Sequence, residues 1–347
     1  NMARGSQATI KDVAKKAGVS VASAGRALGN YGKISDETKQ KVLVAAEELH
    51  YIPNKLAQGM RSHSTKTIAV VVADIQNNFF GAIVAAIEQK AREKGYAVLI
   101  CNSNEKRELE LECLEMLASK QVDGILLAST FTDRKEIPTK YVKTVFEKFP
   151  IVTFDRKING FPFTSVLTDN YAMAYTVTKY LIGLGHDGIA TIGSEREKAV
   201  SNTVKEREEG YRAALREAGI SHDGICITVD WQKEAETEKR INILLDYHRI
   251  TAVIVLNNSI VGGFLNVLDA RKMRFPDQIS VVTWDDEEHN VFMKMTSVRQ
   301  PCKKMGELAA TSLIEQIESE DLHQEELTIT LNQTLVKRES CKICRVY

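Results

Sequence analysis

The chain has 347 residues, of which 44% are hydrophobic, and its 46 basic and 46 acidic side chains cancel. A chain of this length and composition can bury a substantial core, and it suggests two or three domains. It shows neither an apolar run long enough to cross a bilayer nor a basic-then-apolar signal segment. These properties argue against a membrane protein and a secreted protein, so we expect a cytoplasmic one.

The neutral total conceals a split between the two ends of the chain. Residues 1–66 hold eleven Lys/Arg and five Asp/Glu, a balance of +6, which leaves −6 for the rest of the chain. A basic head on an acidic body favours a polyanionic partner for the head alone. A solvated helical face would explain the lysines nearly as well, so charge by itself does not decide.

The basic head reads as three short helices. Thr9 and Asp12 form a capping-box pattern before the first helix, and Gly18 can end that helix in a left-handed turn. Ser20 and Ser35 are placed to cap the second and third helices. Two helices joined by a tight glycine turn are typical of the helix-turn-helix arrangement.

The second helix is nearly bare on one side. One stripe of it would hold only Val21, Ala22, Gly25, Arg26 and Gly29. An interior glycine costs about 1 kcal/mol relative to alanine, so the small residues call for a reason. A bare face allows close approach to another surface, and one arginine on it can reach O6 and N7 of a guanine. We interpret this face as binding DNA; a helical hairpin packed on the rest of the protein is the alternative.

After residue 66 apolar strands alternate with amphipathic helices. This pattern predicts an α/β core of two doubly wound parallel-sheet subdomains. Ligands in such folds bind beyond the carboxyl ends of the strands. The polar residues that close the expected strands are Asp74, Ser129, Asp155, Asp169, Asn257 and Asp285.

No pattern points to catalysis or to a cofactor. The seven histidines lack the spacing of metal ligands, and neither a G-x-S-x-G motif nor a phosphate-binding glycine loop occurs in a suitable context. Cys341 and Cys344 form a C-x-x-C near the end, but without a second pair we favour a frayed tail over a redox or metal site. We therefore expect a binding protein that is not an enzyme.

Several ordered motifs resemble the lactose-repressor/galactose-repressor (LacI/GalR) family of bacterial transcription regulators. The headpiece and hinge match in "TIKDVAKKAGVSVASAGRAL" and "ISDETKQKVLVAAEELHYIPNKLAQGM". The match continues through "TKTIAVVVADIQNNFF", "TDNYAMAY", "LIGLGHDGIATIG" and "ISVVTWDD", and it covers the chain from Thr9 to Cys341. The resemblance implies a protein of the bacterial cytoplasm that is associated with the nucleoid.

For the headpiece, the resemblance implies contacts to a double-stranded DNA operator. Base edges would be faced by Val21, Ala22 and Arg26, and phosphates would be contacted by Thr9, Ser20 and Ser23. Gly25 and Gly29 stand where the family commonly has serine and asparagine. Base specificity would then rest more heavily on Arg26 and on apolar contact with a thymine methyl group.

Residues 54–61 resemble the family's hinge helix, which folds when paired across a dimer. Asn54 and Met60 are the DNA-contacting residues that this match implies, with Met60 as the wedge in the minor groove. Gly59 makes ordering of such a helix more costly. A flexible linker is the alternative.

For the core, the resemblance implies the periplasmic sugar-binding fold, with a small polar effector such as a sugar, a sugar phosphate or a nucleoside-like molecule in the cleft. An aromatic ring can pack on a sugar, while Arg and carboxylate groups hold its hydroxyls. Asn78 and Asn258 depart from the family's usual proline and aspartate. The matching effector positions are Gln76, Phe79, Ser129, Asp155, Arg156, Arg207, Trp231, Asn257 and Asp285.

The expected domain organisation follows from these matches. The ranges are a tail at 1–8, a headpiece at 9–53, a hinge at 54–66, a core at 67–340 and a tail at 341–347. Within the core we expect one subdomain at about 67–163 and 302–325 and the other at about 164–301 and 326–340.

The resemblance implies a two-state switch. A homodimer, paired through helices near 80–94 and 262–268, would read a pseudo-palindromic operator. An effector, as inducer or corepressor, would change the angle between the subdomains. A phosphoprotein could replace the small effector, and a small-molecule receptor whose head docks on a protein is a second reading.

The hinge match gives a direct test. We expect Met60→Ala to weaken operator binding with little change in effector affinity, because the wedge contacts only DNA. Fluorescence anisotropy with labelled operator and calorimetry with effector would measure the two affinities. Equal operator binding by the variant would remove the wedge role from Met60.

Overall fold

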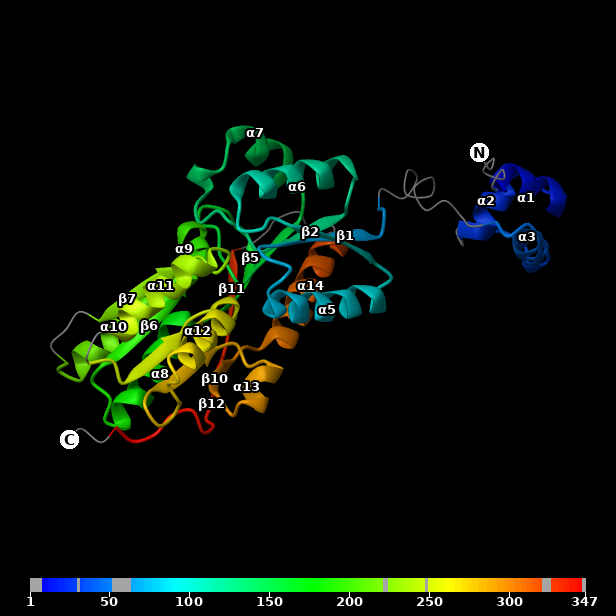
Figure 1. Cartoon of the computed structure of the whole chain (residues 1–347). Helices are drawn as coiled ribbons and strands as arrows, with labels where there is room; N and C mark the ends of the chain where they lie inside the picture. The colour runs from blue at the N-terminus through cyan, green and yellow to red at the C-terminus, as the bar shows by residue number, and fades with distance from the viewer. Residues whose placement is uncertain are drawn as a thin grey trace. The chain divides into compact units, whose positions relative to one another are not determined.

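The chain divides into two compact units, residues 1–66 and residues 67–347. A computed structural model describes residues 8–29, 32–51, 64–220, 224–246, 249–319 and 326–344. We call the described part of the first unit the headpiece and that of the second unit the core (Figure 1). The expected hinge contacts Asn54 and Met60 lie outside the described residues.

The headpiece holds three helices, α1 (Ile10–Ala17), α2 (Val21–Gly29) and α3 (Asp36–Glu48). The expected capping box is present, because Thr9 accepts from the Asp12 backbone while Asp12 accepts from that of Thr9. Gly18 ends α1 with a φ of 66°, in the left-handed region that favours glycine. Small apolar side chains fill the centre between the helices: Val13, Ala14, Ala24, Ala27, Val42, Ala45 and Ala46.

The first subdomain of the core is built on a six-stranded parallel sheet of order β11-β5-β4-β3-β1-β2. Its strands are β1 (Thr67–Val72), β2 (Ala97–Asn102), β3 (Gly124–Leu127), β4 (Ile151–Phe154), β5 (Thr164–Thr168) and β11 (Leu327–Leu331). Its helices are α5 (Asn78–Glu93), α6 (Arg107–Ser119), the short α7 (Thr139–Tyr141) with the π-turn Val142–Phe146, and α14 (Cys302–Glu318).

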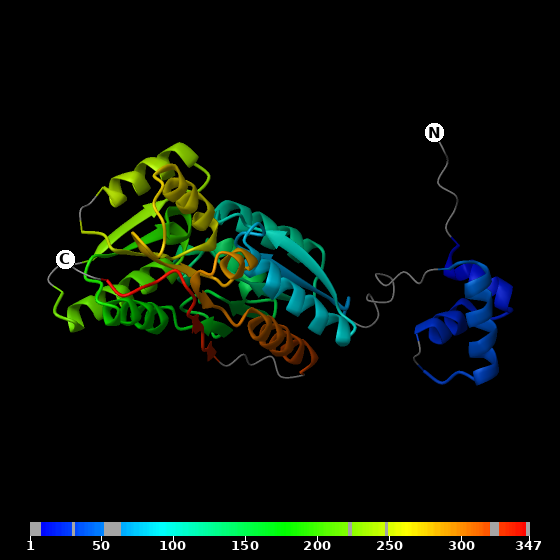
Figure 2. The same ribbon diagram turned by 60° about the horizontal axis from the view of Figure 1, so that its bottom comes forward.

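Burial on both faces explains the continuous apolar strands. In β1, Ile68 and Val70 pack with α5 and α14, whereas Ala69 and Val71 pack with α6. Successive strand residues point to opposite faces, so a strand covered on both sides needs apolar residues at every position. Figures 1 and 2 show helices on both sides of each sheet. Among the helices of the described ranges, none has the length and apolar character needed to cross a membrane.

The second subdomain repeats the plan with a six-stranded sheet of order β12-β10-β9-β8-β6-β7. All neighbours are parallel except β12, which pairs antiparallel with β10 at one edge. The strands are β6 (Ile189–Ser194), β7 (Ile225–Val229), β8 (Ala252–Val255), β9 (Ser280–Trp284), β10 (Thr296–Arg299) and β12 (Thr334–Val336). The helices are α8 (Asn170–Gly183), α9 (Glu195–Val200), α10 (Thr203–Glu217), α11 (Glu234–Leu245), α12 (Asn258–Ala270) and α13 (Glu288–Phe292).

The chain crosses between the two sheets in three places, after β5, after β10 and after β11. Gln300 joins these crossings, since its Oε1 accepts from Gln333 Nε2 at 2.8 Å and from Thr168 Oγ1 at 3.5 Å. All three side chains are buried. The three chain crossings between the subdomains are therefore packed together and joined by hydrogen bonds.

Two expected boundaries are corrected by the sheet order. We expected residues 164 and 326 to begin the parts of the second subdomain, but β5 and β11 pair with each other and complete the first sheet. An apolar strand pattern identifies a strand without identifying the sheet that it joins, which explains the error. The crossings instead follow residues 168 and 331.

The segment at 341–344 is also corrected, because it is not a frayed tail. The Cys341 thiol lies 3.3 Å from the carbonyl oxygen of Val281, and the Cys344 backbone N donates to Leu184 O at 2.7 Å. Both cysteines are free thiols. The core therefore extends at least to Cys344.

The packing of α14 on α5 predicts opposite effects of two glycine substitutions. A Cβ atom at Gly306 would lie 2.5 Å from the Ile83 carbonyl oxygen on α5, whereas one at Gly81 meets nothing within 4 Å. We expect Gly306→Ala to lower the free energy of unfolding by about 1–3 kcal/mol through overpacking. Gly81→Ala should raise it by up to about 1 kcal/mol. Urea unfolding measures the change in the free energy of unfolding for each variant. Changes of the same sign in the two variants would contradict this packing.

Candidate functional site

The exposed face of the headpiece lies on the first turns of α2. Val21 is 45% exposed, Ala22 is exposed, and Ser23 and Arg26 are half-buried. Ser20 begins the helix, because its hydroxyl accepts from the Ser23 backbone N at 3.1 Å. Two apolar side chains and hydroxyls thus lie at the start of a helix whose backbone N–H groups favour phosphate, and the guanidinium of Arg26 lies in its last turn.

One part of the expected bare face is wrong. Gly25 is buried, so the accessible stripe consists of Val21 and Ala22 with the half-buried Arg26 and Gly29. The Arg26 stem lies against Gly32, where an added Cβ atom would come within 3.2 Å of its Cδ. Arg26 Nε lies 3.4 Å from the Ala22 carbonyl oxygen, a long hydrogen bond. Gly25 therefore serves packing within the headpiece, and Arg26 remains the long cationic side chain of that face.

In the core, polar residues from both subdomains meet where the strands end. Asp155 follows β4 in the first sheet and Asp285 follows β9 in the second. Both have left-handed backbones, with φ of 63° and 66°, and both are less than a tenth exposed. Such a conformation is uncommon for residues other than glycine and is frequent at functional sites. The two subdomains thus present equivalent aspartates to one cavity.

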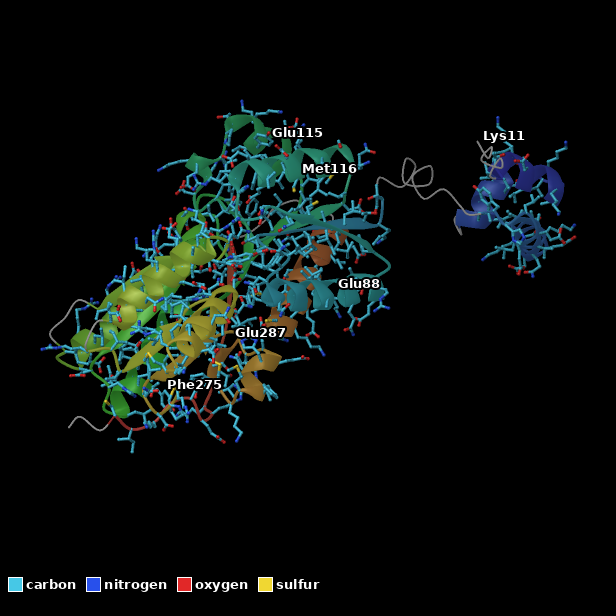
Figure 3. All side chains as sticks on the ribbon, viewed as in Figure 1. Lys11, Glu88, Glu115, Met116, Phe275 and Glu287 are labelled. Atoms are coloured by element: carbon cyan, nitrogen blue, oxygen red, sulfur yellow. The ribbon has the colours of Figure 1, made fainter. Side chains whose placement is uncertain are left out.

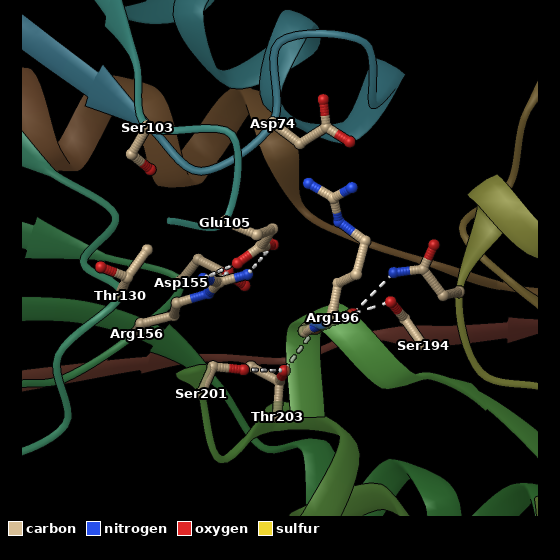
Figure 4. A network of polar contacts seen from close by, with 12 residues as sticks. Asp74, Ser103, Glu105, Thr130, Asp155, Arg156, Ser194, Arg196, Ser201 and Thr203 are labelled. Carbon is tan, nitrogen blue, oxygen red and sulfur yellow. Dashed lines mark hydrogen bonds and ion pairs between the residues drawn. The ribbon is translucent and has the colours of Figure 1, made fainter. Parts of the chain in front are cut away.

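Arg156 organises the first-subdomain side of this cavity. Its Nη1 and Nη2 donate to the two carboxylate oxygens of Glu105 at 2.8 and 2.6 Å, and its Nε lies 3.3 Å from Asp155 Oδ2 (Figure 4). This bidentate pair is buried on both sides. Beside it, Arg196 of the second subdomain donates to the Asn104 carbonyl oxygen at 2.9 Å. The rim of the cavity is therefore closed by a contact between subdomains.

Arg207 organises the second-subdomain side. Its Nε donates to Asn170 Oδ1 at 2.8 Å and its Nη1 to the Leu256 carbonyl oxygen at 2.6 Å. The guanidinium lies 4.4 Å from the centre of the Trp284 ring, a cation–π contact. Arg207, which we expected from the family match alone, is therefore a rigid, buried cation.

The pKa values of three buried carboxylates near Arg207 shift in different directions. Burial alone would raise the pKa of Glu197, but Arg207, Arg156 and hydrogen bonds hold that pKa below its usual value. Burial raises the pKa of Asp155 to about 6 and that of Asp285 to about 7, and the arginines offset this only partly. Perturbed carboxyl groups of this kind mark candidate binding sites.

Little open space remains at the centre of the cavity. The volume left for the centres of water molecules is about 20 Å³, which is room for about one water. Sites for sugar-sized ligands measure about 300 Å³ or more. An adjoining groove of about 330 Å³ by the same measure shares Phe79, Asp285 and Gln300 with the cavity. A ligand therefore needs the subdomains or their side chains to move apart.

Direct contacts hold the subdomains together beside this groove. Asn78 Nδ2 donates to Glu287 Oε2 at 2.9 Å, and Asn258 Nδ2 donates to Asn77 Oδ1 at 2.9 Å and also to Glu287. Glu287 lies where the subdomains meet (Figure 3). Both positions that depart from the family pattern, 78 and 258, thus take part in contacts between the subdomains.

The sequence located much of this cavity and missed part of it. Three expected residues do not line it: Gln76 is exposed, Ser129 turns away to donate to Glu110 at 2.6 Å, and Trp231 is half-buried in a turn after β7. The expected residues that do line it are Phe79, Asp155, Arg156, Arg207, Asn257 and Asp285. The sequence analysis missed Asn77, Phe80, Glu105, Glu197 and Gln300.

The two missed acids, Glu105 and Glu197, share a recognisable position. Glu105 and Glu197 follow β2 and β6 by three residues, beyond the single strand-end position that we considered. Glu105 has a left-handed backbone (φ 55°), which turns it back to the sheet edge. Searching three residues past each expected strand would have found both acids.

Comparison with known proteins identifies the family. Residues 65–339 match the model for periplasmic binding proteins and the sugar-binding domain of the LacI family, and residues 9–54 match that for bacterial regulatory proteins of the lacI family. The chain belongs to the LacI family. This confirms the resemblance seen in the motifs and the expected fold class.

Two relatives span almost the whole chain. The transcriptional repressor PurR of Serratia proteamaculans is 30% identical over 96% of each chain. The transcriptional regulator RegA of Clostridium saccharobutylicum is 33% identical over 96% of this chain and 98% of its own. These LacI-family relatives are named as regulators of transcription, in agreement with the expectation that the chain is not an enzyme.

Two solved LacI-family structures share the architecture. A Lac repressor dimer bound to operator and the anti-inducer ONPF has a TM-score of 0.82, covers 96% of this chain and 99% of its own, and is 23% identical, which supports the fold alone. A complex of the regulator CelR with cellobiose has a TM-score of 0.67 and 28% identity, with the same coverage.

The buried aspartates predict a pH dependence. The Asp285 pKa is about 7 in the folded core against an ordinary 3.8. The folded state therefore holds this proton when the unfolded state has lost it, and the stabilisation is lost as pH rises through about 7. We expect Asp285→Asn to raise the free energy of unfolding more at pH 8 than at pH 5, by on the order of 2 kcal/mol.

Urea unfolding of the variant and the native chain at the two pH values measures this difference. Asp269→Asn, on the exposed end of α12, is the control because it removes the same charge outside the cavity. The control should change stability equally at both pH values. An equal gain from Asp285→Asn at pH 5 and pH 8 would show that Asp285 ionises normally in the folded core.

Proposed function

We propose that this protein is a ligand-responsive transcriptional repressor that binds a pseudo-palindromic operator as a dimer. A small, polar, sugar-like effector in the core cavity would shift its affinity for DNA. Membership of the LacI family supports the regulator, and the cavity of carboxylates and guanidiniums between two subdomains supports the effector. The similarity to the transcriptional repressor PurR supports repression.

The accessible face of α2 is the observation that carries the DNA-binding role. Val21 and Ala22 are exposed in the first turn and Arg26 is partly exposed in the last turn of a helix that follows a tight glycine turn. The reach of an Arg side chain to guanine and the fit of small apolar groups to a thymine methyl suit this face to the major groove. The +6 balance of residues 1–66 supplies attraction to phosphates.

Exposed apolar groups support pairing with a second copy. On α13, Val291 is 59% exposed and Phe292 is 89% exposed. At the sheet edge, β2 pairs only with β1 in the described core, and its Leu99 and Ile100 are 38% and 47% exposed. An uncovered apolar edge strand is unfavourable in a monomer. These surfaces add to the helices near 80–94 and 262–268 as parts of the proposed interface.

One observation favours the second reading, a receptor whose headpiece docks on a protein. Leu43 and Val44 of α3 are 42% and 45% exposed, and Val44 lines a shallow surface pocket with Lys16 and Glu48. Salt separates the two readings. Binding to DNA through phosphates falls log-linearly and steeply with salt, whereas docking through an apolar patch does not.

Arg26→Ala tests the proposed base contact. Duplexes selected from a randomised pool by the native protein provide the operator, and a scrambled duplex provides the reference. We expect the variant to lose about 1–3 kcal/mol of preference for the selected duplex, because a bidentate arginine–guanine contact is worth that much. Fluorescence anisotropy over a salt series measures both affinities.

Lys41→Ala is the matched control, because Lys41 is an exposed cation that already pairs with Glu37 at 2.7 Å. This variant should keep the native preference. An Arg26→Ala variant with undiminished preference would refute base reading by this face. Absence of binding to any duplex by the native dimer at low salt would refute the regulator itself.

A further inference from the structure

The cavity contains more carboxylates than guanidiniums. It is lined by the acids Glu105, Asp155, Glu197 and Asp285 and by the bases Arg156 and Arg207, all with side chains about nine-tenths buried or more. The two guanidiniums share the four acids: Arg156 pairs with Glu105 and Asp155 and also acts on Glu197, while the charge of Arg207 acts on Glu197, Asp285 and Asp155. When ionised, these groups leave a surplus of two negative charges.

Asp285 is the acid with an unused acceptor. Its Oδ1 is buried and has no hydrogen-bond partner within the described residues. By contrast, Glu105 accepts two bonds from Arg156, and Glu197 accepts from Asn257 at 2.6 Å and from Thr203. A buried acceptor without a donor costs about 1–3 kcal/mol, and more when it is charged. Asp285 Oδ1 is thus an acceptor that a ligand's donor can satisfy.

The approach to Asp285 is also acidic. The adjoining groove is lined by Asp286, Glu287 and Glu288 and by one cation, Arg299. Asp286 is neutralised, because it accepts from Ser297 and from Arg299 and pairs with Arg338 at 2.7 Å. Glu287 has neutral amide donors and His289 at 3.6 Å, and Glu288 is exposed. Glu287 and Glu288 therefore leave the groove with an excess of negative charge, which raises the local concentration of cationic ligands.

We propose that the effector of this regulator is a polyol that carries an ammonium group, an amino sugar or amino alditol, and that Asp285 binds the ammonium. The proposal rests on the proposed function, which makes the cavity an effector site. An ammonium brings three donors and a charge that offsets half of the surplus. Asn257 and Gln300 face the same cavity and can bind hydroxyls. A phosphate or carboxylate ligand would add to the surplus instead.

Other cations fit the cavity less well. Within the described ranges, the His, Cys, Asp and Glu side chains form no group of three or more that could hold a metal ion. A hydrogen-bonding organic cation needs only one unpaired acceptor and room for its hydroxyls. The surplus of charge and the free Oδ1 therefore point to an ammonium.

The binding should strengthen as pH rises. Asp285 is faced by Arg207 on α10, Glu197 on α9, Glu287 before α13 and Cys302 on α14, and burial raises its pKa to about 7. The ammonium of an amino alditol such as glucamine, a primary alkylamine, stays charged below pH 8, while Asp285 ionises through this range, so glucamine is the ligand for the pH series. Affinity for such a ligand should therefore grow between about pH 6 and pH 8.

The test compares ligands that differ in one group. Glucamine, sorbitol and gluconate share a six-carbon polyol chain and end in an ammonium, a hydroxyl and a carboxylate. Glucosamine, glucose and glucuronate provide a ring series, in which the ammonium replaces the C2 hydroxyl and the carboxylate replaces the C6 hydroxymethyl group. We expect the ammonium member of at least one series to raise the melting temperature of the full-length protein and to bind roughly tenfold or more tightly than its neutral partner by calorimetry.

Two variants assign the effect to Asp285. Asp285→Asn should remove the preference for the ammonium member, while Asp269→Asn, which removes a charge outside the cavity, should keep it. Tighter binding of the neutral or anionic members than of the ammonium members would overturn the inference. Absence of binding by all six ligands would also overturn it. So would an unchanged preference in Asp285→Asn. Because operator binding is measured separately, each of these results leaves the regulator itself standing.

Discussion

Two arginines share four carboxylates in the space between the sheets, and the arrangement of the core depends on that sharing. Burying a charge without a partner costs several kcal/mol, so removal of either guanidinium would leave two acids uncompensated. Arg156 follows β4 of the first sheet, and Arg207 lies on α10 of the second subdomain. Each subdomain therefore supplies one cation and two acids. The strand ends are held where each guanidinium can compensate the carboxylates beside it.

This network lies next to the three chain crossings. Gln300 lines the cavity, accepts hydrogen bonds from both other crossings, and its side chain favours the ionised form of Asp285. A ligand that binds Asp285 therefore acts next to Gln300, the residue that joins the crossings. Its leverage on the subdomain angle equals its differential affinity for the two arrangements, and DNA bound to the proposed dimer would change effector affinity by the same factor.

The sequence predicted the parts of this design that follow from periodicity and from strand ends. Continuous apolar runs made β1 and several other strands recognisable, and Asp155, Asn257 and Asp285 were found because they close strands. Tertiary choices were not readable: β5 and β11 look like any apolar strand, Ser129 binds Glu110 in preference to the cavity, and Gly25 packs inward. Glu105 depends on a left-handed turn after β2 that no periodicity signals.

The two asparagines at 78 and 258 hold the subdomains together without cancelling negative charge. The Asn78 amide donates to Glu287 across the groove, and the Asn258 amide donates to Asn77 across it and to Glu287 within the second subdomain. The subdomains are thus held closed by neutral donors. Neutral donors leave the charge of Glu287 in place, whereas a salt bridge would cancel it. The closed core is thus stabilised while the negative surplus is preserved. A cationic ligand can offset that surplus and satisfy Asp285, and in doing so it compensates for the contacts that its entry must open.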